Sequence, residues 1–154
     1  MKTKLNQQQS QTTNLYDQDF NLWLEKTANL LKNRQLEELD YDNLIEEIEA
    51  MGRSEKRAIE SNLVVLLMHL LKYKYQPKKR TNSWRYTIRE HRRRIILSLE
   101  DSPSLKRYLA DVFNSCYIYA RQEAVDETGL SLGVFPLESP FSVEQTLNFE
   151  FLPQ

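Results

Sequence analysis

Residues 63–71, which read LVVLLMHLL, constrain the fold more than any other part of the chain. A helix over these residues is apolar on nearly every side, so it should lie at the centre of the protein. The segment is less than half of the roughly 20 residues that cross a bilayer, so it predicts a buried helix and not a membrane span. Three glycines among 154 residues are too few for turn-rich β architectures. We therefore predict an all-α fold.

Apolar periodicity predicts where the first helices lie. Apolar residues between positions 20 and 31 recur at the i, i+3, i+4, i+7 spacing of a helix. Asp40 can cap a second helix that stops at Gly52, and Ser54 can begin a third that ends before Pro77. The inner face of the second helix should hold Leu44, Ile45, Ile48 and Met51.

The second half of the chain predicts three more helices. Ser83 can cap a fourth, and Ser102 with Pro103 opens a fifth that should end near Gly129. A capping-box pattern at residues 142–145 predicts a short last helix. The expected architecture is a single-domain bundle of about five main helices plus this short C-terminal helix.

Length and composition indicate one domain in the cytoplasm. Residues 1–13 are polar and have little to bury, so we expect a flexible tail, followed by one all-helical domain over residues 14–154. The start of the chain lacks the apolar core of a secretory signal. The single cysteine, Cys116, permits no internal disulfide and falls at a core position. We expect a cytoplasmic protein with no membrane partner.

Positive charge is concentrated between residues 72 and 94, which contain ten Lys or Arg residues and a single acid, Glu90. The whole chain carries a net charge of −1, so the two flanks are acidic. The basic stretch could be a footprint for a polyanion, with aromatic side chains that stack on bases. It could equally pair with the acidic flanks or be solvated, and a sequence pI near 6.2 is low for a dedicated nucleic-acid domain. The candidate binding residues are Lys72, Gln76, Lys78, Lys79, Arg80, Ser83, Trp84, Arg85, Thr87, Arg89, Arg92 and Arg93.

Two histidines are candidates for chemistry. His69 lies in the most apolar helix near cations, which would keep its imidazole neutral and suited to proton transfer. The alternative is a structural imidazole, hydrogen-bonded across the core near Asn62. If the third and fourth helices form a hairpin, His91 can face the same pocket as His69. With a carboxylate they could bind a divalent metal, but no HExxH or Glu-x-x-His motif is present, so we expect no metal site and no cofactor.

Two acids near the end of the fifth helix complete the candidate residues. Glu123 falls on the apolar face by helical counting, and Glu127 follows one turn later. A buried carboxylate needs a partner, so we expect a salt bridge to an arginine of the fourth helix.

Several blocks of the sequence resemble a bacterial family known as domain of unknown function 29, which is abundant in photosynthetic bacteria. The resemblance runs from about Tyr16 to Pro153. It rests on YDQDF, WL, LDYDNLIEEIE, MGRSEKR, HLLKYKYQP, SWRYTI, PSL, ETGL, FP and the terminal FLP.

The resemblance implies an all-helical domain and no established activity. Its shared pattern includes polar residues around one turn, which suggests a site or contact surface there. Family members often carry Gln where this chain has His91, which favours His69 as the catalytic candidate. The other residues of this shared pattern are Lys72, Gln76, Ser83, Trp84 and Thr87.

We therefore predict a binding or regulatory module that contacts its partner through the basic turn and the helix within residues 72–94. The expected partner is another protein, including a second copy of this chain, or a nucleic acid. The alternative is a hydrolase, for example a nuclease, that uses His69 with a nearby carboxylate or metal.

Overall fold

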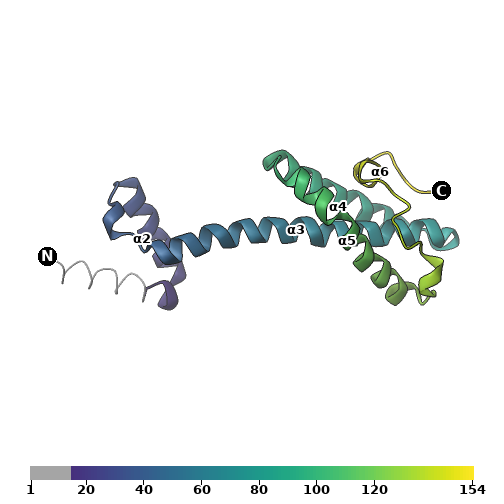
Figure 1. Cartoon of the computed structure of the whole chain (residues 1–154), viewed down its shortest axis with the longest axis horizontal. Coiled ribbons are helices and arrows are strands. Elements are labelled where there is room, and N and C mark those ends of the chain that lie inside the picture. The colour runs from purple at the N-terminus through teal and green to yellow at the C-terminus, as the bar shows by residue number, and fades with distance from the viewer. Residues whose placement is uncertain (1–14) are drawn as a thin grey trace. The chain divides into compact units, whose positions relative to one another are not determined.

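The computed structural model describes residues 15–154, and all regular secondary structure in that range is helical (Figure 1). The predicted all-α fold is confirmed. The expected tail, residues 1–13, lies outside the described residues. Residues 15–18 are helical, and the remaining elements are α2 (Phe20–Lys32), α3 (Tyr41–Tyr75), α4 (Asn82–Asp101), α5 (Leu105–Thr128) and α6 (Val143–Leu147), with 3-10 turns at Leu36–Glu38, Pro77–Lys79 and Leu132–Val134.

The chain divides into two compact units, and the boundary between Arg53 and Ser54 falls within α3. In the first unit, Trp23 is fully buried and its indole Nε1 donates to Asp40 Oδ2 at 3.3 Å. Asp40 also accepts from the backbone nitrogen of Asn43 at 3.5 Å, as expected of the residue that caps α3. The predicted inner face of the second helix is wrong for Ile45, Ile48 and Met51, which are exposed (Ile45 51 %, Ile48 56 %, Met51 61 %).

The second unit holds the main core. The part of α3 within this unit contributes side chains with no exposed surface, α4 lies beside it and α5 crosses it (Figure 1). Ile88 and Ile95 of α4 and Tyr117 and Ala120 of α5 belong to the same cluster. The central position predicted for residues 63–71 is confirmed. The fully buried leucines of α3 are Leu63, Leu66, Leu67, Leu70 and Leu71.

One predicted boundary is wrong: α3 continues through Gly52 and Ser54. A glycine inside a helix costs only about 1 kcal/mol relative to alanine, and good helix formers on both sides offset that cost. The cap of α4 is Thr81 and not Ser83, and α5 begins at Leu105, two residues after Pro103. The end of α5 at Gly129, which has a φ of 70°, and the capping box of α6 are as predicted.

We expect Gly52→Ala to raise the free energy of unfolding by about 0.5–1 kcal/mol, because alanine restricts the unfolded chain and favours the helix. Gly52 is exposed, and a Cβ built there has no heavy atom within 4 Å. Urea unfolding followed by circular dichroism measures the change. Gly129→Ala is the control and should lower stability by about 1–2 kcal/mol, because its φ of 70° is left-handed. Destabilisation by Gly52→Ala would contradict a continuous α3.

None of the helices in residues 15–154 combines the length and the apolar character that a bilayer span requires.

Candidate functional site

The basic turn links α3 to α4 within the second unit. Pro77 has no backbone N–H to continue α3, and Pro77–Lys79 forms a single 3-10 turn. The Thr81 hydroxyl then accepts from the backbone nitrogen of Trp84 at 3.2 Å and starts α4. Lys78 and Lys79 are exposed. Together with Tyr75, Gln76 and Pro77 they line an open recess of about 290 Å³.

Lys72 is buried and joins three helices. Its ammonium forms an ion pair with Glu127 of α5 and lies 4.6 Å from the centre of the Trp84 ring on α4. A buried ammonium needs such partners, because desolvation strongly disfavours an unpaired charge. The salt bridge expected for Glu127 therefore exists, but its partner is a lysine of α3 and not an arginine of α4. Glu123 is exposed, contrary to the apolar position expected for it.

Arg80 and Arg92 contact the C-terminal segment through its backbone. Arg80 donates to the carbonyl of Tyr73 at 2.7 Å and to that of Pro153 at 3.3 Å. Arg92 is 1 % exposed, and its Nε donates to the carbonyl of Thr146 at 2.7 Å. Burial lowers the pKa of Arg92 to about 10, so the guanidinium stays charged at neutral pH.

Arg121 of α5 has the same role, and the sequence reasoning missed it. Its guanidinium donates to the carbonyls of Phe135 at 2.9 Å and Leu132 at 3.0 Å. One sequence feature could have pointed to Arg121: it is an isolated arginine on a helix that precedes a loop-rich segment. Arg80, Arg92 and Arg121 therefore hold the segment after α5 to the helices of the second unit.

Besides Arg93 and Arg94, four cations at the turn and on α4 are exposed: Lys78, Lys79, Arg85 and Arg89. Among residues 15–154, none of them forms an ion pair with an acid. Arg85 Nε donates to the hydroxyl of Tyr73 at 3.2 Å. Tyr86, one residue after Arg85, is 70 % exposed. We call these four cations and Tyr86, all of which are exposed at the turn or on α4, the basic face.

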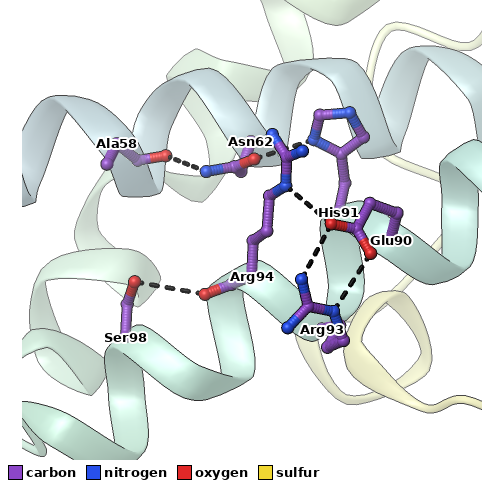
Figure 2. Close-up of polar contacts among 7 residues, drawn as sticks. All are labelled: Ala58, Asn62, Glu90, His91, Arg93, Arg94 and Ser98. Carbon is purple, nitrogen blue, oxygen red and sulfur yellow. Dashed lines mark hydrogen bonds and ion pairs between the residues drawn. The ribbon is translucent and has the colours of Figure 1, made fainter.

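Arg93 is tied to its own helix. Figure 2 shows Glu90 accepting from both Arg93 and Arg94, at 2.9 and 3.0 Å. These hydrogen bonds lower the pKa of Glu90 to about 2. Arg93 and Arg94 therefore share one carboxylate, and neither belongs to the basic face.

The remaining candidates lie at the edges of this surface. Gln76 is half-buried and lines the recess. Ser83 is exposed, and its carbonyl accepts from the hydroxyl of Thr87 at 3.0 Å. The structure thus brings Gln76 to the recess beside the lysines, and places the Ser83–Thr87 contact within the first turn and a half of α4.

The two histidines have defined hydrogen bonds. His69 Nδ1 lies 2.9 Å from the carbonyl of Val65, which can only accept, so Nδ1 carries the proton and Nε2 is the basic nitrogen. His91 Nδ1 lies 2.8 Å from Asn62 Oδ1, and the Asn62 amide donates in turn to the carbonyl of Ala58 (Figure 2). Nδ1 of His91 is therefore also the donor.

Burial lowers the pKa of both histidines, with a smaller contribution from Lys72 at His69 and from Arg94 at His91. A charge on His69 lowers the pKa of His91 further. In residues 15–154, no three His, Cys, Asp or Glu side chains are grouped as a metal site requires.

We expect stability to fall as the pH drops below about 6.5, the pKa of histidine in an unfolded chain. Because the folded pKa of His69 and of His91 is lower, the unfolded state binds more protons in this range. Melting temperatures measured between pH 8 and pH 5 test this. The His69→Gln/His91→Gln variant should show a flatter profile over the same range. An equally steep profile in that variant would contradict the assignment.

Cys116 is a core residue, as the sequence indicated. It is 4 % exposed at the floor of an open hollow of about 670 Å³ between α3 and α5, which is also lined by Glu60, Val64 and Tyr119. Burial raises the pKa of the thiol to about 11, so it stays protonated at neutral pH.

A protein-family model described as "Domain of unknown function DUF29" matches residues 15–152. The match therefore spans helices α2 to α6 and both units of the chain. A search of curated proteins and a search of solved structures find no match.

Proposed function

This chain belongs to the DUF29 family, whose description assigns no activity, and from the geometry of the turn we propose that it is a cytoplasmic binding module for a negatively charged partner. The surface that binds is the basic face. The partner is a nucleic acid or an acidic protein surface.

One observation carries the proposal: several cations of the basic stretch are already used inside the fold, and others have no acidic partner among residues 15–154. Arg80 and Arg92 bind carbonyls, and Lys72 binds Glu127. The four cations of the basic face do not pair with acids in this way. They are exposed and have no acidic partner in residues 15–154: Lys78, Lys79, Arg85 and Arg89. Unpaired cations gathered on one surface attract polyanions and steer their association.

Two features around these cations support a polymeric ligand. The exposed ring of Tyr86 is available for stacking, which strengthens the binding of single-stranded nucleic acids. The recess beside Pro77 can accept a group of the partner between Tyr75 and the two lysines. Both features lie next to the cations of the basic face.

Fluorescence anisotropy with labelled single-stranded DNA, single-stranded RNA and a polyglutamate peptide tests the proposal. If the four cations contact four phosphates, the affinity should fall roughly 50-fold between 50 and 200 mM salt. Arg85→Glu/Arg89→Glu should reduce binding at least about tenfold. The control is Lys106→Glu/Arg107→Glu, which changes the net charge equally on exposed residues of α5. No binding at low salt, or equal losses in both variants, would refute the basic face as the site.

His69 supports a second candidate function, a hydrolase such as a nuclease. Its neutral imidazole carries the proton on Nδ1, which leaves Nε2 free to accept a proton as a general base. Turnover of RNA and DNA substrates, with and without added divalent metal, should then be lost in His69→Ala and kept in the Arg85→Glu/Arg89→Glu variant at saturating substrate. Equal turnover by wild type and His69→Ala would exclude this role.

A further inference from the structure

The first part of α3 carries a row of exposed apolar side chains on one helical face. Tyr41, Ile45, Ile48 and Met51 follow one another at spacings of four, three and three residues. Each is about half exposed or more, from 49 % for Tyr41 to 61 % for Met51. We call these four side chains the apolar row. Contiguous apolar surface of this kind marks a site of association.

The first unit has little core of its own to explain this surface. Among residues 15–53, the buried large apolar side chains are Trp23 and Leu39. The main hydrophobic cluster consists of residues from Ile59 onward. A unit as small as Met1–Arg53 usually needs oligomerisation, a metal or disulfides to supply enough buried surface. The single cysteine of the chain, Cys116, lies in the other unit.

Charged side chains of α3 flank the apolar row. Arg53 pairs with Glu46 at 2.5 Å and with Glu49 at 3.9 Å, so these three side chains partly neutralise one another. No charged side chain belongs to the row itself. An interface between two identical chains places the same patch on both sides, which suits an uncharged apolar surface and disfavours a charged one.

The exposed apolar area of the first unit approaches that of a dimer interface. In the same unit, α2 adds three exposed apolar side chains, Phe20, Leu24 and Leu31, which are 39–44 % exposed. Seven large side chains that are about half exposed present roughly 500–900 Å², taking about 150–250 Å² for each fully exposed one. A stable interface buries about 800 Å² on each partner. A dimer interface therefore needs the α2 side chains as well as the apolar row.

We infer that the apolar row, together with Phe20, Leu24 and Leu31 of α2, is the interface of a homodimer, in which the first unit of one copy packs against the same surface of a second copy. The driving force is apolar burial, so the dimer should survive at high salt. Binding at the basic face should instead weaken with salt. The inference does not depend on the proposed function. Raising the salt concentration should weaken binding at the basic face and leave the dimer intact.

Sedimentation equilibrium of the full chain between about 1 and 100 µM tests the inference. Wild type should be a dimer at both 50 and 500 mM salt. Ile48→Asp should raise the dimer dissociation constant at least about 100-fold, because a two-fold interface acquires two buried carboxylates. The matched control is Ile118→Asp on α5, since Ile118 has the same exposure as Ile48, 56 %. This control should leave the dimer unchanged.

Met51→Ala separates loss of the interface from loss of the helix. Alanine is the better helix former, so circular dichroism should show undiminished helix content. The dimer dissociation constant should nevertheless rise about tenfold or more. A monomeric wild type at 100 µM, or equal effects of Ile48→Asp and Ile118→Asp, would overturn the inference. A monomer that cosediments with lipid vesicles would overturn it too and assign the row to a membrane surface.

Discussion

Arg92→Ala should lower the free energy of unfolding by about 3–5 kcal/mol. The side chain is 1 % exposed, and its guanidinium donates to the carbonyls of Thr146 at 2.7 Å and Gln145 at 3.4 Å. These carbonyls end α6, where a helix has unsatisfied acceptors and partial negative charge. Alanine would leave the Thr146 carbonyl without this donor and a cavity where the long side chain lay.

Urea unfolding followed by circular dichroism measures this loss, and two variants make it specific. Arg92→Lys keeps the charge but cannot reproduce the planar set of donors, so it should be intermediate. Arg93→Ala removes an exposed arginine one position away, which pairs only with Glu90 of its own helix among residues 15–154, and should leave stability nearly unchanged. If Arg92→Ala were as mild as Arg93→Ala, the attachment of α6 through Arg92 would be wrong.

Glu127→Ala should cost about 1–3 kcal/mol, because it leaves the buried ammonium of Lys72 without its counter-ion. The cost is below that of a fully buried pair, since the Glu127 side chain is 50 % exposed and partly solvated. Lys72→Met should change stability by less than about 1 kcal/mol. The methionine fills the same space against Trp84, and the half-exposed Glu127 can turn to water.

Both variants break the same ion pair, but we expect Glu127→Ala to lose more stability than Lys72→Met. Thermal and urea unfolding of Glu127→Ala, Lys72→Met and the double variant should place the double variant close to Lys72→Met, since no unpaired buried charge remains. A Lys72→Met variant that is less stable than Glu127→Ala would show that Lys72 does more for stability than neutralise Glu127.

The sequence predicted the helices well because the signals for them are local. The periodicity of residues 20–31, the capping box at Ser142 and Gln145, and the stop at Gly129 all correspond to the observed elements. The predicted break at Gly52 failed for an equally local reason: one unfavourable residue is weaker than the preference of both flanks.

The candidate site was predicted only in part. Sequence counting placed His91 near the third helix, and the structure gives the contact, with Asn62. Counting could not show which cations bind carbonyls of the C-terminal segment, because these carbonyls belong to residues more than 50 positions away from Arg92 and more than 70 from Arg80. It also could not identify Arg121, which lies outside the basic stretch.

By itself the sequence determined the all-helical class, the buried centre at residues 63–71 and the concentration of charge between residues 72 and 94. Each depends on composition or on spacing along one helix, which short-range sterics and burial decide. Only the tertiary structure decided that Lys72 and Arg92 face inward while Arg85 and Arg89 stay exposed, with no acidic partner among residues 15–154. The partner of a charged side chain is set by what the fold brings beside it, and the same residue types one turn apart can therefore serve stability or binding.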